Sequence, residues 1–265
     1  MKSIKQIGTL GRTFSWEQWR ASRFRMFALP AVLGLLLFGV NVVASQYPVV
    51  LTITSEEILQ AHAERYFTDI SGSEFILGLL IVQGPYIMMV LCAIIGGNVA
   101  GTLVTQHIES GRFEMLLNAP YERGRLFHGF VLGAVIITMI QTLVFGLIAI
   151  GSTALLLSMY GVSFDGSIGG YLYIALFSPL PVAVWATLIV ITLRIHSGVG
   201  ATVGEFEDLG DLVALAPPLA GLFVVSLNPG ISVLWLTAGM CALALLAIVL
   251  STATVRYWFH PVDLF

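Results

Sequence analysis

Six stretches of the sequence are apolar over about the length that a helix needs to cross a lipid bilayer. About 20 helical residues span the roughly 30 Å of hydrocarbon in a bilayer. The stretches are 26–45, 75–104, 127–158, 171–193, 212–227 and 231–255. Only 10% of the residues are charged, whereas about a quarter are charged in a typical soluble domain. We therefore expect an all-α membrane protein whose single domain, 26–255, has six transmembrane helices.

The positively charged residues predict which side of the membrane each helix end faces. With six spans, only Arg65 of the 12 lysines and arginines lies on one side. The others are Lys2, Lys5, Arg12, Arg20, Arg23, Arg25, Arg112, Arg123, Arg125, Arg194 and Arg256. Cytoplasmic loops are enriched in basic residues. We expect both termini, including the tail 256–265, on the cytoplasmic side of the plasma membrane.

The segment 1–25 combines basic and aromatic side chains ahead of the first span. These residues are Phe14, Trp16, Trp19 and Phe24, together with Arg20, Arg23 and Arg25. Aromatic rings and basic side chains gather where a membrane meets water. We expect this segment to form an amphipathic helix at the cytoplasmic interface.

The sequence lacks the residue patterns of several chemistries. A P-loop needs a lysine after a glycine-rich turn, but the only lysines are Lys2 and Lys5. The histidines are scattered without metal-ligand spacing, and Cys92 and Cys241 both lie inside apolar stretches. We expect no catalytic residue, cofactor site or metal site in this chain, and no binding of nucleic acid.

The connection between the second and third stretches has the most specific pattern. Phe113, Leu116 and Leu117 have the i, i+3, i+4 spacing of an apolar stripe on a short helix, and Pro120 ends it. The segment resembles the permease subunits of ABC-2 type transporters, which are mostly exporters. In that family a Glu and a Gly precede Leu-Glu-x-Leu-Leu-x-x-Pro and a basic residue. The matching residues are Glu109, Gly111, Phe113, Glu114, Leu116, Leu117, Pro120 and Arg123, with Phe113 in place of the usual Leu.

The resemblance implies that this segment, with Arg112 beside its apolar stripe, is a cytoplasmic coupling helix. It would seat in a groove of a separate ABC ATPase, present in two copies, which binds ATP and Mg²⁺. It also implies a second permease subunit, either an identical or a related chain, and export as the direction of transport. The alternative for the segment is an amphipathic turn that only lies on the bilayer surface.

Few polar side chains occur inside the expected spans. They are Gln83, Tyr86 and Asn98 in the second span and Thr138, Gln141 and Thr142 in the third. These groups could line a translocation route, or they could bond to one another and to backbone carbonyls. The sequence leaves both interpretations open.

Small residues and acidic residues indicate further contacts. Gly97-x-x-x-Gly101 and Gly129-x-x-x-Gly133 allow another backbone to approach closely, either within the chain or between two copies. The acidic cluster Glu205, Glu207, Asp208 and Asp211 precedes the fifth span. We expect the macrodipole of that helix to stabilise the cluster, because carboxylates are favourable near a helix N-terminus.

Two other functions stay open at this point. A polytopic membrane enzyme would need a nucleophile, an acid pair or a metal set at bilayer depth, and the sequence shows none. A scaffold subunit would bind the ATPase without moving cargo.

Overall fold

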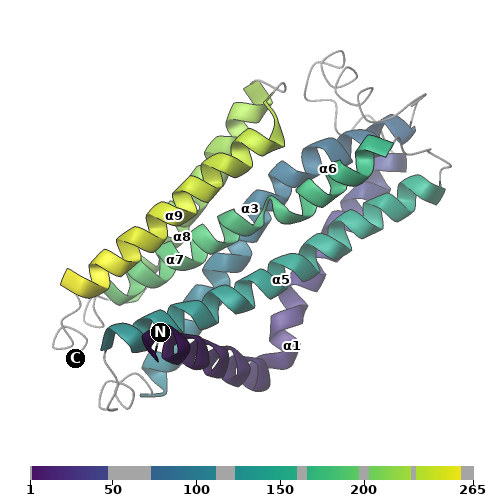
Figure 1. Ribbon diagram of the computed structural model, residues 1–265. Coiled ribbons are helices and arrows are strands. Elements are labelled where there is room, and N and C mark those ends of the chain that lie inside the picture. The colour runs from purple at the N-terminus through teal and green to yellow at the C-terminus, as the bar shows by residue number, and fades with distance from the viewer. Residues whose placement is uncertain are drawn as a thin grey trace.

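The computed structural model describes residues 2–46, 73–111, 123–159, 166–196, 203–227 and 231–257 (Figure 1). These residues form seven helices and no strand, so the expected all-α class is confirmed for the described part of the chain. The helices are α1 (Lys2–Gln46), α3 (Ser73–Glu109), α5 (Arg123–Met159), α6 (Gly166–Phe177), α7 (Leu180–His196), α8 (Val203–Leu227) and α9 (Val233–Tyr257).

Four stretches of the described helices are long and apolar enough to cross a membrane. They are Gly84–His107, Gly124–Leu156, Leu172–Arg194 and Val233–Ala253, and they coincide with the expected second, third, fourth and sixth spans. The expected first and fifth spans coincide with shorter apolar stretches, Phe27–Val40 and Gly210–Val225. The structure thus supports a membrane-spanning protein by the length and composition of its helices.

The helices pack side by side in one bundle, with α3 and α7 at its centre (Figure 1). The helix α1 packs along α5, while α8 and α9 pack beside α7. Side chains of α7 are buried almost without interruption from Val182 to Ile191, as expected for a helix that is apolar on all sides. In contrast, α9 exposes Trp235, Leu245 and Val249. Apolar surface of this extent fits a hydrocarbon environment better than water.

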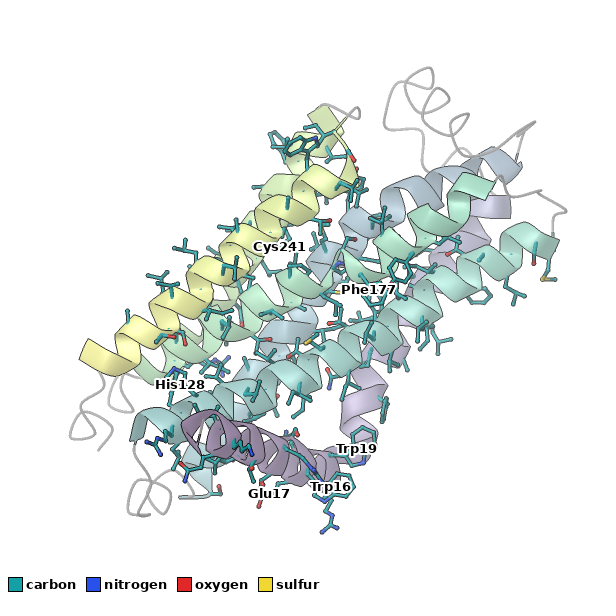
Figure 2. All side chains as sticks on the ribbon, in the orientation of Figure 1. Trp16, Glu17, Trp19, His128, Phe177 and Cys241 are labelled. Carbon is teal, nitrogen blue, oxygen red and sulfur yellow. The ribbon has the colours of Figure 1, made fainter. Side chains whose placement is uncertain are left out.

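The helix α1 continues through the boundary at residues 25 and 26, where we expected the interface helix to end and the first span to begin. It changes direction on the way, and Trp19 lies at the corner (Figure 2). Pro30 lies eleven residues beyond Trp19, so its effect on the helix falls after this corner and does not account for it. Proline removes one helical hydrogen bond and clashes with the carbonyl four residues earlier, which bends a helix. Trp19 and Phe27 pack edge to face with ring centroids 5.3 Å apart.

Prolines account for the course of the expected fourth and fifth spans. The fourth is divided into α6 and α7 at Ser178 and Pro179, where the residue before proline is disfavoured in a helix. The fifth lies within α8, which stays helical through Pro217 and Pro218 and begins at Val203, ahead of the expected residue 212.

Candidate functional site

The segment that resembles a coupling helix connects the end of α3 to the start of α5. Residues 112–122 lie outside the described residues, and with them Arg112, Phe113, Glu114, Leu116, Leu117 and Pro120. Glu109 is the last residue of α3 and Arg123 the first of α5, and the structure describes only their backbones. Gly111 has a φ of 64°. Glycine adopts this left-handed conformation without a steric cost and commonly follows a helix C-terminus, so it turns the chain out of α3.

The two helices that flank this segment are longer than a bilayer is thick. Both α3 and α5 have 37 residues, which at 1.5 Å per residue is about 55 Å, against about 30 Å of hydrocarbon. The end of α3 and the start of α5 lie at the same end of the bundle (Figure 1). Tilt alone does not absorb such an excess, so part of each helix is longer than the hydrocarbon layer requires.

Three rings from three helices meet beside this end of the bundle. Phe14 of α1 lies edge to face against His107 of α3 and Phe130 of α5, with centroids 5.9 and 5.8 Å away. The rings of His107 and Phe130 are 5.2 Å apart. Phe14 is only 6% exposed. We call these three residues the aromatic junction. It joins the first half of α1 to both helices that lead to the coupling segment.

Glycines bring α1 and α5 into close contact next to the aromatic junction. A Cβ atom on Gly129 would lie 2.6 Å from Cβ of Leu10, and one on Gly133 would lie 2.9 Å from Cβ of Phe14. Real Cβ atoms do not approach so closely, so only glycine fits at these positions. The Gly129-x-x-x-Gly133 pair therefore serves packing within the chain in this structure.

The polar residues proposed for a translocation route lie in different surroundings. The Tyr86 hydroxyl donates to the Ile231 carbonyl at 2.9 Å, which ties α3 to the residues ahead of α9. Thr138 and Thr187 share a hydrogen bond of 2.9 Å between α5 and α7. Of the proposed route residues, Tyr86 and Thr138 thus form hydrogen bonds between elements of the bundle.

The remaining route residues differ in exposure. Gln141 and Thr142 are buried in α5, and the Gln141 Oε1 atom has no hydrogen-bond partner among the described residues. Asn98 is exposed on α3, and the side chain of Gln83 lies outside the described part. The structure brings Thr138, Gln141 and Thr142 together on α5, as their spacing predicts, and ties Tyr86 to a different part of the bundle.

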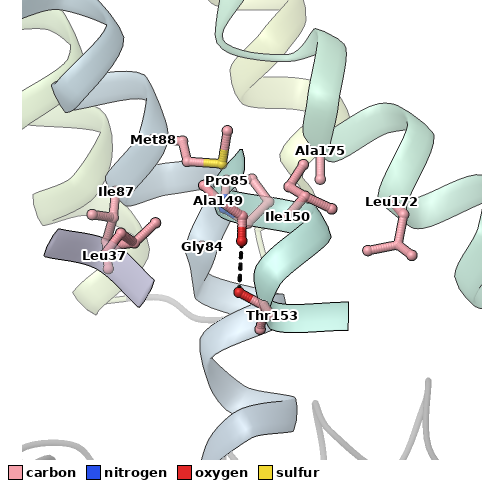
Figure 3. Close-up of a pocket in the computed structure, with 10 residues that line it drawn as sticks. All are labelled: Leu37, Gly84, Pro85, Ile87, Met88, Ala149, Ile150, Thr153, Leu172 and Ala175. Carbon is pink, nitrogen blue, oxygen red and sulfur yellow. Dashed lines mark hydrogen bonds between the residues drawn. The ribbon is translucent and has the colours of Figure 1, made fainter. Parts of the chain in front are cut away.

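A small apolar pocket lies between α1, α3, α5 and α6 (Figure 3). Among the described residues that line it, the only polar side chain belongs to Thr153, whose hydroxyl donates to the Ala149 carbonyl of its own helix at 2.8 Å. The lining residues are Leu37, Gly84, Pro85, Ile87, Met88, Ala149, Ile150, Thr153, Leu172 and Ala175. This lining contains no side chain suited to acid, base or nucleophilic chemistry.

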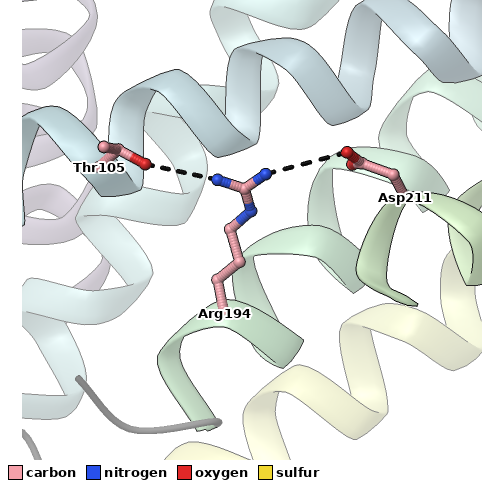
Figure 4. A network of polar contacts seen from close by, with 3 residues as sticks. All are labelled: Thr105, Arg194 and Asp211. Carbon is pink, nitrogen blue, oxygen red and sulfur yellow. Dashed lines mark hydrogen bonds and ion pairs between the residues drawn. The ribbon is translucent and has the colours of Figure 1, made fainter. Parts of the chain in front are cut away.

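An arginine joins three helices at the C-terminal end of α7 (Figure 4). Arg194 Nη1 donates to Thr105 Oγ1 of α3 at 3.4 Å, and Nη2 lies 3.9 Å from Asp211 Oδ2 of α8. Cβ atoms on Gly101 and Gly97 would lie 2.8 Å from the guanidinium and 3.2 Å from Asp211 Oδ1. The missing side chains of this glycine pair therefore leave a groove on α3 that the two charged groups occupy.

Asp211 has a different role from the one we expected. Because α8 begins at Val203, Asp211 lies in its third turn, whereas the effect of the helix macrodipole falls off within the first turn. In the structure its carboxylate pairs with Arg194. The side chains of Glu205, Glu207 and Asp208 lie outside the described part.

Sequence reasoning missed the partners in these contacts. Phe14 stands out as part of an aromatic segment, but nothing marks His107 and Phe130 as its neighbours. The sequence does contain a signal for Arg194, because it places a basic residue at the end of an apolar helix, and such a residue needs a partner if it is buried. The structure shows that Arg194 is only 14% exposed. Gly97 and Gly101 on α3 are a further signal, because small residues leave room for such a side chain.

The described fold is a helical bundle in which four stretches are long and apolar enough to cross a membrane. Comparison of the chain with protein-family models, with curated proteins and with solved structures found no match. Among the described residues, no group of three histidine, cysteine or acidic side chains comes together as a metal site would require.

Proposed function

We propose that this chain is the membrane-spanning permease subunit of an ABC-2 type transporter that exports its cargo. A separate ABC ATPase, in two copies, docks on the segment from Glu109 to Arg123 and binds ATP and Mg²⁺. A second permease subunit completes the transporter in the plasma membrane. Both termini of the chain are cytoplasmic.

The observation that carries this proposal is the pattern between Glu109 and Arg123, taken with its place at the end of the two longest apolar helices of the bundle. The apolar stripe Phe113, Leu116 and Leu117 is of the kind that docks into a groove of a partner protein. The lengths of α3 and α5 support a segment that extends beyond the apolar layer. The aromatic junction supports the same role, because it fixes α1 against both helices that carry the segment.

In the proposed mechanism, ATP binding brings the two ATPase subunits together and displaces the coupling segments with them. Helices move as rigid bodies, because a packed interior shifts between discrete arrangements and does not deform continuously. The displacement passes along α3 and α5, through the aromatic junction to α1 and through Arg194 to α7 and α8. The cavity between the two permeases then opens outward and releases the cargo.

Affinity purification of the full chain in mild detergent tests the proposal. A partner with a P-loop should co-purify and hydrolyse ATP. Phe113→Asp removes the central apolar anchor of the segment and should weaken this complex by about 2 kcal/mol, about thirtyfold. Met159→Asp, at the opposite end of α5, is the matched control and should leave the complex intact.

Three outcomes contradict the proposal in different ways. A chain that purifies alone and has an activity of its own is an enzyme. A chain that binds the ATPase without moving cargo in vesicles is a scaffold. Tags at Met1 and Gly111 that label from opposite sides of the membrane would place the segment out of the reach of a cytoplasmic ATPase.

A further inference from the structure

The first half of α1 turns one face away from the bundle. The face toward α5 is occupied, because Leu10 and Phe14 lie against Gly129 and Gly133. Figure 2 shows Trp16 and Glu17 on the side of α1 that points away from the other helices. The exposed residues of this outward face are Lys5, Gly8, Thr9, Arg12, Thr13, Trp16, Glu17 and Arg20. The amphipathic character that the sequence predicts is thus satisfied by packing inside the protein, and the polar face is the one left for a partner.

Positive charge dominates this outward face. Its charged side chains are the three basic residues Lys5, Arg12 and Arg20 and one acidic residue, Glu17. Among the described residues, the charged groups of Lys5 and Arg12 make no hydrogen bond or ion pair. The guanidinium of Arg20 lies over the ring of Trp16, 5.2 Å from its centroid. Three cations on one helix face, with no ion pair to an acidic side chain in the described part of the chain, call for an anionic partner.

The hydroxyl groups on the outward face do not compete for that partner. Thr9 Oγ1 donates to the Lys5 carbonyl, and Thr13 Oγ1 donates to the Thr9 carbonyl, each at 2.9 Å. Their hydroxyl protons are therefore used within the helix. Recognition by this face rests on the cationic groups and on Trp16, which is 54% exposed.

The continuation of α1 locates this face relative to the membrane. The apolar stretch begins at Phe27, and Val32, Leu35 and Leu36 within it are each more than half exposed. Arg20 precedes Phe27 by seven residues, which is about 10 Å of helix. The interfacial region on each side of a bilayer is about 5 to 8 Å thick, and charges act over about 8 Å at physiological salt. Because α1 changes direction at Trp19 and does not continue along the axis of the apolar stretch (Figure 2), Arg20 and Trp16 stay near the depth where arginine and tryptophan side chains meet lipid headgroups.

We propose that the outward face of the first half of α1 binds the headgroups of anionic phospholipids, through Lys5, Arg12 and Arg20, with Trp16 at the level of the interface. A protein partner is less well matched, because the core of a protein interface is depleted in charged residues, and on this face Trp16 is the one exposed aromatic side chain among charged groups and hydroxyls. The binding does not depend on the transport function proposed above. Each basic residue near an anionic membrane surface favours contact with that surface about fivefold.

Lipid selectivity at one labelled position tests this proposal on the full chain. A fluorophore is attached at Thr13→Cys, with Cys92→Ala and Cys241→Ala to remove the native thiols. The protein is reconstituted in phosphatidylcholine vesicles that contain a minor share of quencher lipid. The quencher is a nitroxide at one shallow acyl position, on either phosphatidylglycerol or phosphatidylcholine, so that the two lipids differ only in the headgroup.

We expect quenching by the anionic lipid to exceed quenching by the zwitterionic lipid about threefold or more at low salt. The ratio should fall to about one in 1 M salt, where charges are screened beyond about 3 Å. It should also fall to about one in the variant Lys5→Gln, Arg12→Gln, Arg20→Gln. These side chains are exposed, so the variant should keep the unfolding temperature of the parent.

Two controls keep the test decisive. Glu17→Lys adds a cation to the same face and should raise the ratio, whatever the triple variant does to the fold. A label at Ser158→Cys, which lies exposed near the other end of α5, should show a ratio of about one throughout. A ratio of about one at Thr13 in low salt, or a raised ratio that persists in 1 M salt, would overturn the proposal.

Discussion

Arg194 and Asp211 face each other across the groove that Gly97 and Gly101 leave on α3, with Nη2 and Oδ2 3.9 Å apart. Arg194 is mostly buried, at 14% exposure, whereas Asp211 is 49% exposed. An ion pair this open to solvent contributes at most about 1 kcal/mol. The arrangement also has a steric side, since the guanidinium occupies the space of a missing side chain.

Gly101→Ala tests this packing, because a Cβ atom at Gly101 would lie 2.8 Å from the guanidinium and displace it. We expect a loss of at most about 1 kcal/mol in the free energy of unfolding, because the guanidinium is the end of a flexible side chain and moves aside at the cost of its ion pair. In an Arg194→Ala background the same change should cost nothing. The measurement is a double-mutant cycle of unfolding in detergent. Gly239→Ala, in open space, is the control, and equal costs in the two backgrounds would contradict this account.

Phe14→Ala should remove the aromatic junction. Replacing a buried phenylalanine with alanine lowers the free energy of unfolding by about 3 to 5 kcal/mol, and Phe14 is only 6% exposed. Trp16→Ala, two residues along the same helix, removes a larger ring that is 54% exposed and should cost less than about 1 kcal/mol. Thermal unfolding of the purified chain compares the two variants. Similar losses for both would show that α1 does not pack through Phe14.

Tyr86→Phe should weaken the contact between α3 and the residues ahead of α9. It removes only the hydroxyl that donates to the Ile231 carbonyl at 2.9 Å, so the ring packing stays. We expect a loss of about 0.5 to 1.5 kcal/mol in the free energy of unfolding. Tyr173 is 66% exposed, and Tyr173→Phe should be neutral in the same assay.

Gly111→Ala should disturb the exit of the chain from α3. Nothing lies within 4 Å of a Cβ atom at Gly111, so the cost is conformational, about 1 to 2 kcal/mol for an alanine in the left-handed region. Gly111→Asn should be better tolerated, because asparagine adopts this conformation more readily. If the following segment couples to an ATPase, the alanine variant should lower ATP hydrolysis in the complex more than the asparagine variant does. Equal rates of ATP hydrolysis in the two variants would show that the conformation at Gly111 has no role in coupling.

Local sequence patterns predicted most of the helices. The apolar stretches 75–104 and 127–158 lie within α3 and α5, and the stretch 231–255 overlaps α9 almost completely. Hydrophobic runs of this kind reflect backbone groups that must be satisfied within one helix in an apolar medium. The prolines had less predictable effects. Pro179 ends α6, whereas Pro217 and Pro218 leave α8 helical, since neighbouring elements decide whether the freed carbonyls find partners.

The amino-acid sequence by itself determined that this chain is helical, apolar over membrane-spanning lengths and marked by one unusual segment between Glu109 and Arg123. Only the tertiary structure decided which helix faces meet: Phe14 with Phe130, Thr138 with Thr187, and Arg194 with Asp211. The physical reason is that a helix apolar on all sides, such as α7, carries no periodic signal of its orientation. Its rotation is set by where small residues let backbones approach and by where the few polar groups find partners across the bundle.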